Sequence, residues 1–155
     1  SRSGTAGDAS LKLPMSNFDL LDAARRENIK SCRGVFMRDQ LPEKPNHVET
    51  NIINLDERSC PGTHWVAYAV DPRGVVYFDL YGLAPPKEFL RYSGLAGDIP
   101  IWYSRLPAQT LTDPHICGPE VLYILNVVSR SSAPPHKVMH EYTSGHFKQV
   151  NGLKY

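Results

Sequence analysis

Two apolar runs separated by a short turn constrain the fold of this chain more than any other feature. The runs are His-Trp-Val-Ala-Tyr-Ala-Val at 64–70 and Val-Val-Tyr-Phe-Asp-Leu at 75–80, with Asp71-Pro-Arg-Gly74 between them. β-Branched and aromatic residues favour strands, and a Pro and a Gly at these positions suit a type I hairpin turn. Because both runs are apolar on both faces, the pattern predicts a hairpin inside a covered sheet.

The rest of the sequence predicts short helices and strands around this hairpin. Ser16 and Asp19 have the spacing of a capping box, so a helix is expected over 17–28, with an apolar stripe that includes Phe18 and Leu20. Further elements are expected as strands at 34–38, 51–55 and 99–103, a short helix at 87–92 and a buried helix at 117–128. Pro100 indicates an edge strand or a strand start. The predicted fold class is α+β, a central mixed sheet packed against a helix that carries Cys117 at its N-terminus.

Length and composition predict one domain of 155 residues. The expected divisions are a flexible leader at 1–14, the folded domain at 15–131, and a polar C-terminal tail at 132–155 that is either surface-docked or disordered. The formal charge of +1 excludes a generally polybasic protein, and no apolar run is long enough to cross a membrane. The three widely spaced cysteines fit a reducing compartment rather than a disulfide framework, and no signal peptide is evident.

Cys117 lies where a turn-rich segment becomes an apolar helix. Unpaired N–H groups and the helix dipole at such a position favour the thiolate, which is the form that attacks carbonyls. Gly118 permits close approach of the backbone, and Pro119 is tolerated in a first helical turn. We therefore interpret Cys117 as a nucleophile that needs a base.

The hairpin offers that base and a group to orient it. If Asp71 pairs with Gly74 around a two-residue loop, His64 opposes Tyr81 and has Asp79 as its diagonal neighbour on the same face. A bulge at Gly74 would turn Asp79 to the other face. Gln109 is an amide donor that could share an oxyanion with the backbone N–H of Cys117.

Four segments occur in an order typical of one group of proteases. They are Gly62-Thr-His-Trp-Val-Ala-Tyr68, Val76-Tyr-Phe-Asp-Leu-Tyr-Gly-Leu-Ala-Pro-Pro86, Gln109, and Ile116-Cys-Gly-Pro-Glu-Val-Leu-Tyr-Ile-Leu125. From about Met15 to Arg130 the chain resembles the adenovirus-type (adenain-like) cysteine proteases, which include enzymes of virophages and Maverick/Polinton-like elements. It is more distantly similar to the SUMO-specific proteases.

The resemblance implies a role for each matching residue. Cys117 would be the nucleophile, His64 the general base and Asp79 its orienting group, while Gln109 would help to form the oxyanion hole. Trp65 and Gly118 would lie beside the substrate and the oxyanion. The implied activity is that of a viral or mobile-element maturation endopeptidase, which cleaves capsid and core precursor proteins through a thioester acyl-enzyme.

The same resemblance sets expectations for partners and location. No cofactor or metal is required, although an activating peptide or DNA is compatible with the family; nucleic-acid binding is only weakly supported by the sequence. The expected partners are viral structural precursors, without a membrane, and a monomer is favoured. The expected location is the host cell interior, nucleus or cytoplasm, and the virion.

Several alternatives remain open at the level of sequence. The chain could be a SUMO-type isopeptidase, whose site is nearly the same, or a catalytically inactive binding module on the same fold. His115 is a rival base, but residues so close in sequence to Cys117 seldom face it. His136 and His140 have the spacing of a zinc pair. The two preceding prolines and the missing glutamate indicate that this spacing is coincidental. Cys32 and Cys60 are interpreted as inert or incidentally exposed thiols.

Overall fold

The structure is a computed structural model that describes residues 16–29, 31–55, 64–104, 117–143, 145 and 147–150. The expected leader at 1–14 lies outside these ranges. The elements are α2 (Asn17–Arg26), β1 (Val35–Met37), β2 (Glu49–Asn54), β3 (Trp65–Asp71), β4 (Gly74–Phe78), α3 (Lys87–Gly94), β5 (Ile101–Ser104), α4 (Cys117–Arg130), α5 (Pro135–Thr143) and β6 (Phe147–Val150). Within the described ranges, no helix combines the length and apolar character needed to cross a bilayer.

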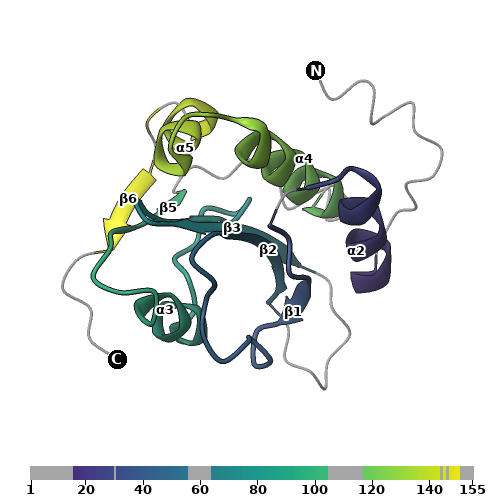
Figure 1. The fold of residues 1–155 in the computed structure, drawn as a ribbon, viewed down its shortest axis with the longest axis horizontal. Helices are drawn as coiled ribbons and strands as arrows, with labels where there is room; N and C mark the ends of the chain where they lie inside the picture. The colour runs from purple at the N-terminus through teal and green to yellow at the C-terminus, as the bar shows by residue number, and fades with distance from the viewer. Residues whose placement is uncertain are drawn as a thin grey trace.

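One mixed sheet organises these elements in an α+β fold, as the sequence predicts. Among the described residues it has six strands in the order β1-β2-β3-β4-β5-β6, with parallel pairing for β1–β2 and β4–β5 and antiparallel pairing elsewhere. Helices α2, α4 and α5 lie on one face and α3 on the other (Figure 1). The β3–β4 hairpin occupies the centre, which explains why both of its faces are apolar.

Side-chain alternation along the hairpin supplies a core on each face of the sheet. On one face, Ala67 and Phe78 pack with α2, α4 and α5. On the other face, Tyr68 and Tyr77 pack with Phe89 of α3. Because neighbouring strand residues point to opposite faces, one hairpin anchors both cores.

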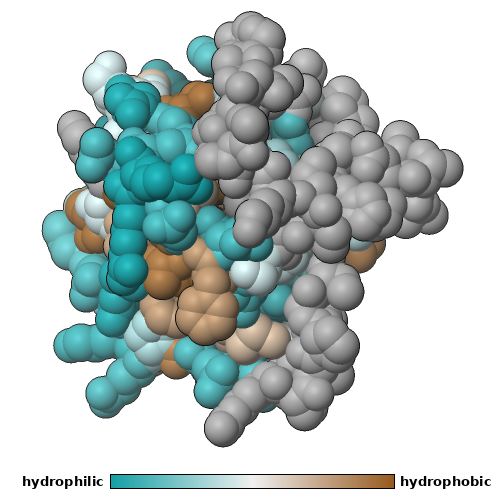
Figure 2. Space-filling view, turned by 90° about the vertical axis from the view of Figure 1, so that its right-hand side faces the viewer, coloured by the Kyte–Doolittle hydropathy of each residue, from teal (hydrophilic) through white to brown (hydrophobic). Residues whose placement is uncertain are grey.

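Helix α2 confirms the predicted capping box but not the whole predicted stripe. The Asp19 N–H donates to Ser16 Oγ over 3.1 Å, and the Ser16 N–H donates to Asp19 Oδ2 over 2.8 Å. Leu20 is fully buried, whereas Phe18 is 85 % exposed. Two residues correspond to about 200° around a helix, so Phe18 and Leu20 cannot share a face. The face at the right of Figure 1, where α2 and β1 lie, shows an apolar patch among hydrophilic residues (Figure 2).

The C-terminal segment, expected to be either surface-docked or disordered, packs on the folded domain. Residues 135–143 form α5, whose Val138 and Met139 are buried in the core on the α4 side of the sheet. Strand β6 pairs with β5 through Phe147 opposite Ser104. These few apolar residues are enough to hold the segment on the domain because they meet an apolar surface that other elements form. The described residues up to 150 therefore belong to the fold. Strand β5 is consequently internal, and Pro100 marks a strand start rather than an edge.

On the face of the sheet that α3 covers, the buried carboxylate of Glu49 connects β2 to β3 and α3. Glu49 is fully buried, and its carboxylate accepts hydrogen bonds from Arg33 Nη1 over 2.8 Å, the Asn46 N–H over 2.7 Å and the Tyr68 hydroxyl over 2.6 Å. The Tyr92 hydroxyl of α3 also donates to it. Burial alone would raise the pKa of Glu49, but these donors together hold that pKa below its usual value.

Replacing this carboxylate should destabilise the protein in a pH-dependent way. Glu49→Gln removes the charge that these donors face and should lower the free energy of unfolding by about 3 kcal/mol at pH 7. Because the folded-state pKa is depressed, this stabilisation is present at neutral pH and is lost as the pH falls through about 4 and below. Urea unfolding of the wild type and of Glu49→Gln, at pH 7 and at acidic pH, measures the stability lost at each pH. Glu88→Gln, which affects a partly exposed ion pair with Arg38, is the control and should cost less than about 1 kcal/mol. A difference in unfolding free energy between wild type and Glu49→Gln that does not change with pH would contradict this account.

Gly74, at the hairpin end, admits no side chain. A Cβ there would lie 2.3 Å from Cζ3 of Trp102 and 2.9 Å from the carbonyl oxygen of Pro100. That carbonyl accepts the Val75 N–H over 2.9 Å, which ties β4 to the start of β5. Only glycine therefore allows the hairpin turn to approach β5 this closely.

Gly74→Ala should destabilise the protein by about 1–3 kcal/mol because a rigid ring and backbone must move. Gly34→Ala is a matched control, since both glycines have a φ of 158° but a Cβ at Gly34 meets only the Phe36 ring, at 3.4 Å. Thermal unfolding of both variants measures the difference. Equal losses in stability would show that backbone conformation, not the close approach, explains the glycine.

Candidate active site

His64 and Asp79 meet at the open end of the β3–β4 hairpin. The strands pair without a bulge, with Asp71 opposite Gly74 and Ala67 opposite Phe78, which is the register expected from a two-residue loop. His64 Nε2 lies 2.8 Å from Asp79 Oδ1, and the side chains are 15 % and 1 % exposed. The structure thus brings together the predicted base and its predicted orienting group.

The position of Asp79 is fixed by its backbone as well as by its side chain. The Asp79 N–H donates to Ser104 Oγ over 3.2 Å, and that hydroxyl donates to the Asp79 carbonyl over 3.1 Å. Asp79 Oδ1 also accepts the Tyr81 N–H over 2.8 Å. Sequence reasoning missed Ser104, because its position beside Asp79 depends on the parallel β4–β5 pairing, in which Tyr77 lies opposite Tyr103.

An aromatic ring covers the imidazole. Tyr81 stacks on His64 with ring centroids 4.5 Å apart and an interplanar angle of 25°. The predicted register placed these residues opposite each other, and the ring contact agrees with it. The His64–Asp79 pair therefore lies partly shielded from water at the rim of the sheet.

Trp65 lies in the core rather than on an open surface. It is 4 % exposed and packs on the α2 and α4 side of the sheet. Its indole N–H donates to Asn17 Oδ1 over 2.6 Å, and Asn54 Nδ2 donates to the same oxygen over 3.2 Å. Sequence reasoning missed Asn17, whose amide oxygen is the polar partner that a buried indole requires. The role of Trp65 beside the substrate stays a prediction.

The other predicted residues are placed only in part. Helix α4 has the bounds Cys117–Arg130 and packs on β3, and Gly118 is buried in it. The side chain of Cys117 and the whole of Gln109 and His115 lie outside the described residues, as does Cys60. Contact between the Cys117 thiol and the imidazole of His64 is therefore a prediction.

The alternative metal-binding histidines, and the arginines that a basic nucleic-acid patch would need, have structural surroundings of their own. His136 stacks on Trp102 with centroids 4.6 Å apart, and His140 packs edge-on against Phe147. Among the described residues, no group of three His, Cys, Asp or Glu side chains could hold a metal ion. Arg33 and Arg38 form ion pairs with glutamates, and Arg26 forms one with Asp22.

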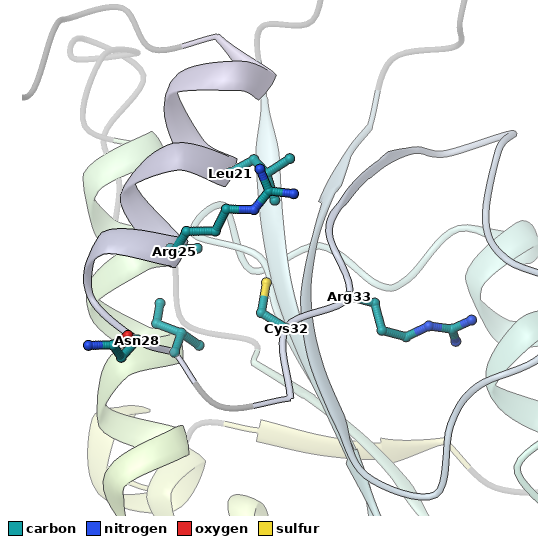
Figure 3. A pocket seen from close by; sticks show the side chains of 7 residues that line it. Leu21, Arg25, Asn28, Cys32 and Arg33 are labelled. Carbon is teal, nitrogen blue, oxygen red and sulfur yellow. The ribbon is translucent and has the colours of Figure 1, made fainter.

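Cys32 lines a surface pocket of about 310 Å³ between α2 and the segment that follows it. Its sulfur lies below Arg25, whereas the Arg33 side chain points away (Figure 3). Burial raises the pKa of Cys32, and a backbone hydrogen bond with Gly34 and the positive charge of Arg25 offset that effect only in part. The neutral thiol is therefore favoured, in agreement with its interpretation as an inert cysteine.

Comparison with known proteins identifies the fold. No family model matches the sequence, and no curated protein matches it. The crystal structure of the ASFV pS273R protease superposes with a TM-score of 0.54 and 18 % identity, covering 86 % of this chain and 67 % of that chain. A selenomethionine structure of that protease gives a TM-score of 0.39 at 20 % identity, with 68 % and 46 % covered, and carries no weight. The chain thus has the fold of a known protease over about two thirds of that protein's length.

Removing the Ser104 hydroxyl should weaken the support of Asp79. Ser104→Ala leaves the buried Asp79 N–H without its acceptor, which should cost about 1–3 kcal/mol of unfolding free energy. Ser93→Ala is the matched control, because the Ser93 hydroxyl only donates to the Leu90 carbonyl within α3. Urea unfolding compares the two variants. Equal losses of unfolding free energy in the two variants would show that the Ser104 hydroxyl gives Asp79 no particular support.

Proposed function

We propose that this chain is a cysteine endopeptidase in which Cys117 is the nucleophile, His64 the general base and Asp79 the group that orients His64. The observation that carries the proposal is the 2.8 Å contact between His64 Nε2 and Asp79 Oδ1 at the end of the central hairpin. Three further facts support it: helix α4 has Cys117 as its first residue, α4 packs on β3, and the fold is that of a protease.

In this proposal, His64 accepts the thiol proton and the Cys117 thiolate attacks the carbonyl carbon of the scissile peptide bond. The backbone N–H of Cys117 and the Gln109 amide donate hydrogen bonds to the oxyanion of the tetrahedral intermediate. His64 then gives its proton to the leaving amine, and a thioester remains on Cys117. Water, deprotonated by His64, hydrolyses the thioester and regenerates the thiol. Asp79 fixes the imidazole orientation and stabilises its charged form throughout.

The proposed substrates are capsid and core precursor proteins of a virus or mobile element, cleaved during particle maturation. This assignment rests on the sequence resemblance and on the fold shared with the ASFV pS273R protease. In this proposal the enzyme acts in the host cell and the virion as a monomer. An activating peptide or DNA is compatible with the proposal.

A proteome-wide cleavage assay tests the proposed chemistry. The purified chain is incubated with a denatured protein extract, and new N-termini are identified by mass spectrometry. Cleavage should be abolished by Cys117→Ala and by His64→Ala, and slowed at least about 100-fold by Asp79→Asn. Cys32→Ala is the control, since burial favours its neutral thiol, and should leave cleavage unchanged. Cleavage that survives Cys117→Ala or His64→Ala would contradict the proposal.

The second candidate function is a ubiquitin-like-protein isopeptidase, because the proposed residues would serve it equally well. A SUMO or ubiquitin vinyl-sulfone probe separates the two. Labelling of Cys117 by such a probe would favour the isopeptidase, and the absence of labelling in a protein that cleaves precursors would favour the maturation endopeptidase.

A further inference from the structure

We propose that Tyr81 is a positioning residue of the His64–Asp79 pair, acting on the imidazole through its ring and on the carboxylate through its backbone. The catalytic meaning of this inference rests on the proposed function. The placement of His64 by Tyr81 does not depend on it.

One residue contacts both members of the pair. The Tyr81 ring stacks on His64 at 4.5 Å and 25°, and the Tyr81 N–H donates to Asp79 Oδ1 over 2.8 Å. The same oxygen lies 2.8 Å from His64 Nε2. A displacement of Tyr81 would therefore disturb the imidazole plane and the acceptor oxygen together.

A tight turn holds Tyr81 in this place. The Gly82 N–H donates to the Asp79 carbonyl over 2.9 Å, and Gly82 has a φ of 72°, which a residue with a Cβ adopts only with strain. Leu80, between Asp79 and Tyr81, is 2 % exposed and anchors the turn in the core on the α4 side. Tyr81 itself is only half-buried, and its ring stacks on the imidazole.

The stack should affect the charge of His64 as well as its orientation. The face of an aromatic ring is electronegative and stabilises a cation placed over it, so the stack favours the imidazolium. The titratable groups against the imidazole include the Asp79 carboxylate and the Tyr81 phenol among the described residues, together with the Cys117 thiol in the proposed site. Both the Asp79 carboxylate and the Tyr81 ring favour the charged imidazole that a thiolate–imidazolium pair needs.

NMR titration of the histidine side chains in the whole protein tests this inference. The chain has six histidines, and a His64→Gln variant assigns the resonance of His64. In Tyr81→Leu the titration midpoint of His64 should fall by about half a pH unit, because the aromatic face is lost. In Tyr81→Phe, which keeps the ring, the midpoint should stay within experimental error of the wild type. Thermal unfolding of each variant establishes that the compared proteins are folded.

Activity supplies the second readout. Tyr81→Leu should lower kcat/KM for peptide cleavage about tenfold, and Tyr81→Phe should restore it to within about twofold. An unchanged His64 midpoint in folded Tyr81→Leu would overturn the inference, whatever the activity. A shifted midpoint in a protein without peptidase activity would uphold the placement of His64 by Tyr81 and refute the proposed function.

Discussion

The unbulged pairing of β3 with β4 is the constraint on which the rest of the structure depends. With Asp71 opposite Gly74, the strand ends carry His64 and Asp79 to one rim, and their side chains meet at 2.8 Å. The same alternation supplies apolar side chains to both faces of the sheet. Shifting the strand pairing by one residue would turn these side chains to the opposite face of the sheet. The register that forms the core therefore also forms the candidate site.

Support for the site comes from segments distant in sequence. Ser104 of β5 bonds to both backbone groups of Asp79, and β5 is itself held between β4 and β6. Strand β6 thus supports the site through its pairing with β5. On the α3 face, the buried Glu49 joins the segment before β1 to β3 and α3 through charged hydrogen bonds. Rigid surroundings of this kind keep a hydrogen-bonded pair in one geometry.

The hairpin and the fold class could be predicted from the sequence because local patterns specify them. The turn residues at 71–74 indicate a short loop, and a two-residue loop without a bulge gives the relative positions of His64, Tyr81 and Asp79; the structure shows that no bulge is present. Ser104 and Asn17 could not be predicted, since their partners are set by strand and helix packing rather than by spacing. For the C-terminal segment the sequence left a surface-docked helix and disorder open. Val138, Met139 and Phe147 are too few to decide between them, because their burial comes from a surface made by other elements. Phe18 was placed wrongly by counting apolar residues without following the helical turn.

The central claim is that His64 activates Cys117. The most direct test is the pH dependence of iodoacetamide labelling, with each modified cysteine located by mass spectrometry in the wild type and in His64→Ala. The account predicts rapid labelling of Cys117 well below pH 8.5, the ordinary pKa of a thiol, and loss of that labelling in the variant. Cys32, whose pKa is raised by burial, is the internal reference. Labelling of Cys117 no faster than that of Cys32, or unchanged by His64→Ala, would contradict the account.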